Sequence, residues 1–165
     1  DNVLVQQVGR MLTAKLLDFG LSRLLTRRQG ALGGTVRWMA PEVVRKDENA
    51  ARPSADIFSL GRLVYMIMTG QTPLEGLGRD AIVAAVCRGD SLALDWPAEA
   101  EALLLREARE LCDACQGMPA ESRPDITQVQ ASVRQWGREP GMPEDLAEVL
   151  TKTFPHPSGS VDLQE

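Results

Sequence analysis

The stretch Gly34-Thr35-Val36-Arg37-Trp38-Met39-Ala40-Pro41-Glu42 decides how this chain is interpreted. Pro41 suits the first turn of a helix, because its missing N–H would have no intrahelical partner there. We therefore expect a short helix from Pro41 to about Arg45. Residues 21–36 show no hydrophobic period and contain several glycines, so a long loop is expected before that helix. Loops of this length are usually functional.

Two short apolar runs precede the loop. Val3-Leu4-Val5 and Lys15-Leu16-Leu17 are separated by Gln, Gly and Arg residues, a pattern that predicts a β-hairpin with a polar connection. Asp18-Phe19-Gly20 follows the second run directly.

Downstream of the loop the pattern is helical. Between Ser54 and Thr69 almost no polar face remains, so we expect a helix that is buried on nearly every side, with Ser54 as its N-cap and Gly70 as its stop. Asp56 and Arg62 interrupt this apolar run, which is also shorter than the roughly 20 residues that a membrane span needs. No membrane segment is expected here.

Apolar residues at helical spacing predict three more helices. A short one carries Ile82, Val83 and Val86 and is ended by Gly89, and a longer one carries Leu104, Ala108, Leu111 and Cys115. Asp125 with Gln128 forms a capping pair ahead of a last apolar stripe, which consists of Ile126, Val129, Val133 and Trp136. After Gly137 we expect a tail with one weak helix over residues 144–152.

Composition and charge limit the classes of function. With 165 residues, 44% hydrophobic and 25% charged, the chain can bury a single core. Its net charge of −5 argues against a nucleic-acid-binding domain. Residues 22–46 nevertheless carry a local charge of +5, and we call their cationic residues the basic strip: Arg23, Arg27, Arg28, Arg37, Arg45 and Lys46. The strip is either a solvated loop or a surface for phosphate or acidic substrate residues.

The cysteines favour a reducing compartment. Their odd count, three, gives no disulfide framework, so a cytoplasmic location is the default, with membrane anchoring of the whole protein left open. Cys112 and Cys115 have the spacing of a metal or redox pair, but the only histidine, His156, lies in the tail. Two buried helix thiols are therefore expected. The first residue is Asp1 with no leader, so we expect a piece of a longer protein and infer no export signal.

Five ordered segments resemble the C-terminal lobe of a eukaryotic-type protein kinase. They are Asn2–Val5, Asp18–Gly20, Gly34–Glu42, Asp56–Gly61 and Arg123-Pro124. The resemblance implies a mainly α fold, a helical bundle with a short β-hairpin at its N-terminal edge and the N-lobe absent. It implies a partial kinase domain over residues 1–137 and a C-terminal tail over residues 138–165.

The same resemblance implies a site for ATP and Mg²⁺. Asn2 and Asp18 are the implied metal ligands, and an amide oxygen and a carboxylate suit this hard ion. Gly20 lets the backbone turn beside the ligand, and Phe19 packs inward. Leu4 lies beneath the adenine ring in the family, although an ordinary strand-core leucine is an equal alternative.

Other positions carry implied roles in positioning and scaffolding. Thr35 contacts the catalytic base and the incoming hydroxyl in Ser/Thr kinases, so Ser/Thr specificity is favoured. Glu42 and Arg123 resemble a buried ion bridge, and Asp56 resembles the structural acid that caps and orients the catalytic loop. Trp38-Met39 and Cys115 are similar to the tyrosine-kinase-like group, although Gln116 replaces the Trp that usually follows that cysteine.

The leading hypothesis is therefore a fragment of a Ser/Thr protein kinase that transfers the γ-phosphate of ATP to a protein hydroxyl. The catalytic Asp precedes the family's Asn by five residues and so lies upstream of Asn2, and the fragment alone is expected to be inactive. Control by phosphorylation is not expected at Ala31, where many kinases carry a phosphorylatable residue.

Two alternatives stay open. A pseudokinase-like scaffold or protein-interaction module would keep this lobe for docking. A free-standing helical interaction domain would expose an apolar surface around Leu4, Leu16 and Phe19 and associate through it.

Overall fold

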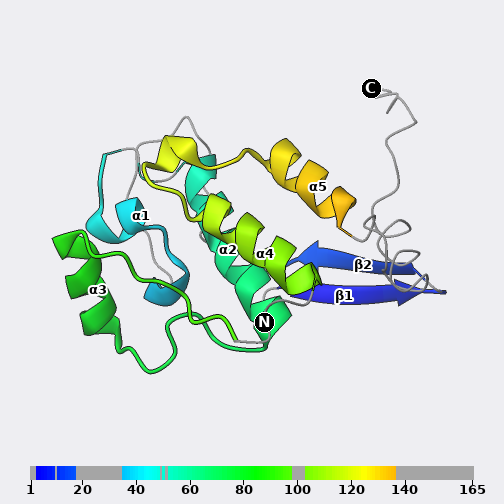
Figure 1. Cartoon of the computed structure of the whole chain (residues 1–165), viewed down its shortest axis with the longest axis horizontal. Coiled ribbons are helices and arrows are strands. Elements are labelled where there is room, and N and C mark those ends of the chain that lie inside the picture. Colours follow the sequence, from blue (N-terminus) through cyan, green and yellow to red (C-terminus); the bar gives the residue numbers. More distant parts are fainter. Residues whose placement is uncertain are drawn as a thin grey trace. The chain divides into compact units, whose positions relative to one another are not determined.

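The computed structural model describes residues 3–9, 11–17, 35–48, 50, 52–97 and 103–136. These residues form one two-stranded sheet and, as predicted, are otherwise mainly helical (Figure 1). They divide into two compact units, one with the sheet and residues 133–136, the other with the described residues between 35 and 132. Of the loop predicted over residues 21–36, residues 21–34 lie outside the described residues, and its last residue, Val36, begins a 3-10 turn. The domain boundary at 137 and the helix over 144–152 also lie outside the described residues.

The sheet is the predicted β-hairpin, with a shorter connection than expected. Strand β1 (Val3–Val8) pairs antiparallel with β2 (Met11–Leu16), and Val8 lies opposite Met11. Only positions 9 and 10 remain between the strands, so the polar residues assigned to the connection belong to the strands. Gly9 has a φ of 62°, which a two-residue turn of this kind requires and glycine adopts readily.

The hairpin exposes apolar side chains. Leu4 is 49% and Leu16 is 67% exposed. They lie on opposite faces of the hairpin, because Leu16 pairs with Val3 and Leu4 pairs with Lys15, so these two residues do not form the single surface that the hypothesis of a free-standing module expects. Alternation along the strands and the register place Val3, Val5 and Leu16 on one face. Phe19, the third member of that predicted surface, lies outside the described residues.

Helix α2 (Pro53–Thr69) is the longest helix of the described residues. Its N-cap is Arg52, with Pro53 in the first turn, so the prediction of Ser54 as N-cap was wrong by two residues. It ends as predicted at Gly70, whose N–H donates the last helical hydrogen bond to the Met66 carbonyl at 2.8 Å and whose φ of 71° then turns the chain out of the helix. Ile67 is exposed, so the helix is not buried on nearly every side.

Helix α4 (Leu103–Cys115) packs beside α2 (Figure 1). The approach is closest at Gly61, where an added Cβ would lie 2.7 Å from the Cys115 Cβ and 3.2 Å from the Cys112 carbonyl oxygen. Both cysteines are buried, which confirms the prediction of buried helix thiols. The packing of this helix pair therefore depends on the absence of a side chain at position 61.

A second contact region joins three short elements. The 3-10 turn η1 (Val36–Trp38) and helix α1 (Pro41–Arg45) lie against α3 (Arg79–Arg88), which ends at Gly89 as predicted. Their shared core consists of Val36, Leu74, Ile82 and Val86. Burial of Val36 in this core therefore fixes the path of the chain directly after Thr35.

The last described elements are η2 (Ala120–Ser122) and α5 (Ile126–Gln135). The predicted capping pair is present, since the Gln128 N–H donates to Asp125 Oδ1 at 2.9 Å and the Asp125 N–H donates to Gln128 Oε1 at 2.8 Å. The hydrogen bond that the Thr127 hydroxyl donates to the Asp125 carboxylate, together with the one from the Gln128 N–H, lowers the pKa of Asp125. Val129 is buried, but Ile126, the first residue of α5, is 60% exposed.

None of the helices in the described part of the chain has both the length and the apolar character that crossing a bilayer requires.

Candidate functional site

The structure describes five of the predicted site residues: Leu4, Thr35, Glu42, Asp56 and Arg123. Asn2, Asp18, Phe19 and Gly20 lie outside the described residues, so their convergence on a metal ion stays a prediction. Leu4 is in β1 and belongs to the unit that holds the hairpin, where its place beneath an adenine ring also stays a prediction. The other four lie in the helical unit.

Residues 35–42 are anchored to α2 through their backbone. The Ser59 hydroxyl donates to the Trp38 carbonyl at 2.8 Å, and Arg62 donates through Nη1 to the Arg37 carbonyl. Two side chains from adjacent turns of one helix thus hold two successive carbonyls. The conformation of the backbone just after Thr35 is therefore set by α2.

The end of the same segment is held by the predicted ion bridge. Arg123 binds Glu42 with both ends of its guanidinium, at 2.7 Å to Oε1 and 2.9 Å to Oε2. The Arg123 side chain is fully buried and that of Glu42 nearly so. A bidentate pair of this kind is strong and geometrically specific.

Arg123 has no N–H without an acceptor. Its three remaining donors reach the Ser54 carbonyl at 2.9 Å, the Gly117 carbonyl at 3.0 Å and Met118 Sδ at 3.4 Å. A guanidinium has five such donors, and all five are used. The bridge therefore joins α1, the start of α2 and the loop after α4.

A second buried arginine, Arg62, was missed by the sequence interpretation. It is 4% exposed, donates through Nε to Gln116 Oε1 at 3.2 Å and lies 4.5 Å from the centroid of the Phe58 ring. Burial lowers its pKa to about 10, so it stays a cation at neutral pH. No described carboxylate forms an ion pair with it.

The surroundings of Arg62 explain a departure from the family pattern. Gln116 stands where a Trp is usual, and it supplies the acceptor that the buried guanidinium needs. The available signal was a charged residue inside an apolar helix, which must find buried partners. The Arg123 guanidinium also lies 5.0 Å from the Phe58 centroid, so one ring contacts both cations.

Asp56 lies in the first turn of α2. Its side chain is exposed on one side, while the protein around the rest of it partly removes it from water and raises its pKa. No described residue donates a hydrogen bond to its carboxylate. Its implied role, orienting the catalytic loop, concerns residues outside the described part and stays a prediction.

Thr35 lies on the rim of a small pocket of about 200 Å³, which we call the Thr35 pocket. Its other lining residues are Val36, Arg37, Arg79 and Ile82. Val36 and Ile82 are buried, so the pocket has an apolar floor. The two arginines give it a positive charge.

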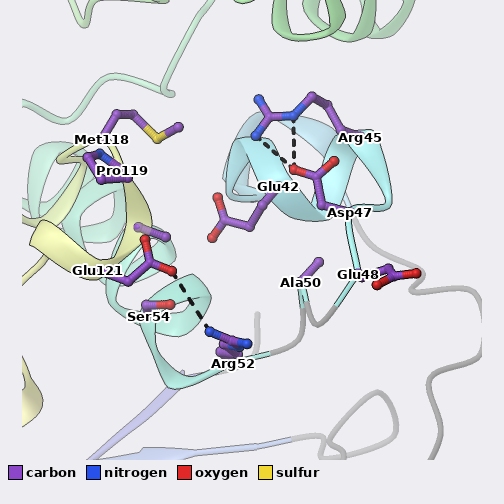
Figure 2. A pocket seen from close by; sticks show the side chains of 11 residues that line it. Glu42, Arg45, Asp47, Glu48, Ala50, Arg52, Ser54, Met118, Pro119 and Glu121 are labelled. Atoms are coloured by element: carbon purple, nitrogen blue, oxygen red, sulfur yellow. Dashed lines mark hydrogen bonds and ion pairs between the residues drawn. The ribbon is translucent and has the colours of Figure 1, made fainter.

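A second pocket, of about 270 Å³, lies among the end of α1, the start of α2 and η2 (Figure 2). Its charges are largely neutralised within the protein, because Arg45 pairs with Asp47 at 2.9 Å, Arg52 with Glu121 at 3.8 Å, and Glu42 with Arg123. Across the described ranges, no group of three His, Cys, Asp or Glu side chains is placed to hold a metal ion. This pocket suggests no chemistry.

Residues 1–133 match the protein kinase domain family, and the chain belongs to that family. The A-Raf serine/threonine-protein kinases of Homo sapiens and Sus scrofa are each 35% identical to it over 129 residues, which is 74% of this chain and 21% of theirs. The RAF proto-oncogene serine/threonine-protein kinase of Xenopus laevis is 41% identical over 85 residues, 47% of this chain and 13% of that protein. The chain thus spans about a fifth of the length of these relatives or less.

These matches confirm the predicted kinship, including the likeness to the tyrosine-kinase-like group. The mainly helical fold with one antiparallel hairpin agrees with the predicted C-lobe. The Glu42–Arg123 bridge is where the motif comparison placed it.

Proposed function

We propose that the protein carrying this chain is an ATP-dependent serine/threonine kinase of the cytoplasm, which transfers the γ-phosphate of ATP to a protein hydroxyl. The Raf relatives are named serine/threonine-protein kinases, which supports serine and threonine hydroxyls as the phosphate acceptors. The main structural support is the anchoring of residues 35–42 by Ser59, Arg62 and Arg123. A catalyst of phosphoryl transfer works mostly by positioning, and positioning requires a rigid segment beside the acceptor.

Asn2 and Asp18 are the proposed holders of Mg²⁺. Their donor set, one amide oxygen and one carboxylate, fits a hard cation that prefers oxygen ligands. The metal would neutralise charge on the phosphates of ATP. Thr35 would contact the base and the incoming hydroxyl, while Glu42 and Arg123 hold its segment in place.

The substitution Asp18→Ala, made in the protein that carries this chain, tests the proposal. Transfer of labelled γ-phosphate to a protein acceptor is expected to fall by about a hundredfold or more, because a charged group at the transferring phosphate is lost. Asp113→Ala is the matched control, since Asp113 is exposed on α4 and forms no ion pair with a described residue. It should keep its activity, and both variants should melt at the temperature of the unaltered protein.

Undiminished protein phosphorylation by the Asp18→Ala variant would contradict the proposal. Absence of transfer already before substitution would favour the pseudokinase-like scaffold. The residue five positions before Asn2 gives an independent check, because an Asp there supplies the base that transfer requires.

A further inference from the structure

The basic strip is not uniform where the structure describes it. Arg45 is neutralised by Asp47, and Lys46 is exposed at the end of α1. Arg37 differs from both, because its guanidinium is half-buried and forms no ion pair with a described carboxylate. Its acceptors are the backbone carbonyls of Pro73 and Leu77, both at 3.5 Å. These are long contacts to neutral acceptors, so no described acidic residue neutralises its positive charge.

A second cation meets Arg37 at the Thr35 pocket. Arg79, the first residue of α3, is exposed, and none of the described carboxylates forms an ion pair with it. The pocket's lining contains both arginines and no acidic residue. Two unneutralised guanidinium groups beside an apolar floor favour an anion, because the floor keeps water away from one side of the contact.

Location suggests what that anion is. Thr35 lines this pocket and, in the proposed function, lies beside the acceptor hydroxyl. An extended substrate rises about 3.3–3.6 Å per residue, so a side chain that enters the pocket comes from a residue close to the acceptor. The methylene groups of a glutamate would pack on Val36 and Ile82 while its carboxylate faces the arginines.

We infer that the Thr35 pocket selects protein substrates that carry an anionic side chain within three residues of the phosphorylated hydroxyl, with Arg37 and Arg79 as the specificity-determining residues. This inference rests on the proposed function and adds its substrate class. It also gives the basic strip a role, since acidic substrate residues were one of its two interpretations. Glutamate and phosphoserine share the required chemistry, and separate peptides distinguish them.

The experiment uses the protein that carries this chain and a set of serine peptides of neutral sequence. Each peptide has Glu, its neutral isostere Gln, or phosphoserine at one of the three positions before or after the acceptor. At one or more adjacent positions the Glu peptide should have a kcat/KM about tenfold above that of the Gln peptide. The gain should appear in KM, as expected for binding that is equal in the ground and transition states, and should shrink with added salt.

Variants at α3 assign the effect to the pocket. Arg79→Ala should reduce the Glu/Gln ratio to about twofold or less, and Arg79→Glu should invert it, so that the Gln peptide becomes the better substrate. Arg88→Ala is the matched control, because Arg88 lies on the same helix, pairs with Asp90 at 2.7 Å and does not line the pocket. It should leave the ratio near tenfold. A larger effect of phosphoserine than of Glu would identify a previously phosphorylated substrate as the preferred one.

The two proposals fail in different ways. Equal phosphorylation of Glu, Gln and phosphoserine peptides, or a ratio unmoved by Arg79→Ala, overturns the inference and leaves the kinase proposal standing. If no peptide is phosphorylated, the kinase proposal fails, and fluorescence anisotropy of the labelled peptides decides the inference. Binding of the Glu peptide about tenfold tighter than the Gln peptide, lost in Arg79→Ala, then supports it, and equal affinities overturn it.

Discussion

Two buried arginines beside one phenylalanine ring show how much a single residue's surroundings matter. Arg123 has a carboxylate partner and an acceptor for every N–H, whereas Arg62 has two neutral acceptors and the Phe58 ring. Arg123 was predictable from motif order, because its partner Glu42 belongs to the same pattern. Arg62 was not, since its acceptors are Gln116 and the Arg37 carbonyl, both remote in sequence. The hydrophobic pattern shows that a charged residue lies in an apolar helix, but it does not show which acceptors that residue contacts.

Removal of the Arg123 guanidinium should be among the most destabilising changes in the molecule. In Arg123→Met, Glu42 stays nearly buried without its counter-charge, and the Ser54 and Gly117 carbonyls lose a donor. We expect the free energy of unfolding, measured in urea, to fall by about 3–5 kcal/mol. In the control Arg52→Ala, which breaks the exposed pair with Glu121 at 3.8 Å, the change should stay within about 0.5 kcal/mol. Comparable losses in the two variants would contradict this assignment.

At the scale of elements, the sequence predicted the helices better than their contacts. The helices α2, α3 and α5 were expected from periodic apolar residues together with stop or capping signals, and α4 was expected from its periodic apolar residues alone. The start of α2 was misplaced because Ser54 is a good N-cap type, but Pro53 already occupies the first turn and makes Arg52 the cap. The close approach of α2 and α4 was not predicted, since a glycine in a helix signals only lower propensity.

Gly61→Ala tests that contact. Alanine favours a helix by about 1 kcal/mol over glycine, yet here its Cβ would overlap the Cys115 Cβ and press on the Cys112 backbone. We expect a net loss of about 1–3 kcal/mol in the free energy of unfolding, because the two helices must separate. Gly78→Ala is the control, since nothing lies within 4 Å of its added Cβ and its φ is an ordinary −72°. A Gly61→Ala protein as stable as this control would contradict the contact.

At the scale of the whole molecule, the fold class followed from the sequence, whereas most of the predicted nucleotide site lies outside the described residues. The resemblance placed the metal ligands at Asn2 and Asp18, and both lie outside the described residues. The Thr35 pocket lies within the described residues, and its lining includes Arg79, which belongs to none of the five motif segments. The apolar hairpin face formed by Val3, Val5 and Leu16 is exposed. It shares only Leu16 with the surface around Leu4, Leu16 and Phe19 through which association was predicted.

Stability at alkaline pH depends on the two buried thiols. Burial raises the pKa of Cys112 to about 12 and that of Cys115 to about 11, from an ordinary value of 9.0. Above pH 9 the unfolded chain therefore loses these protons first, the native state binds more protons, and stability falls as pH rises. At pH 10 the free energy of unfolding should be lower by up to about 3 kcal/mol than at pH 8, from about 1.4 kcal/mol per thiol.

Urea titrations across this pH range measure the effect. The double variant Cys112→Ala/Cys115→Ala should lose most of the alkaline decline, whatever its stability at pH 8. Cys87→Ser should keep it, because Cys87 is exposed. An alkaline decline of the same size in the double variant would assign it to other groups.

The Glu42–Arg123 bridge also has a consequence for synthesis, because its partners are 81 positions apart. At a synthesis rate of about 5–20 residues per second, the ribosome adds Glu42 to the nascent chain roughly 4–16 seconds before it adds Arg123. During this interval the nascent chain holds an acidic group that its final environment would bury, with no counter-charge yet made. Products of a premature stop codon between positions 42 and 123 would keep that defect permanently, which makes them substrates for chaperones and proteases.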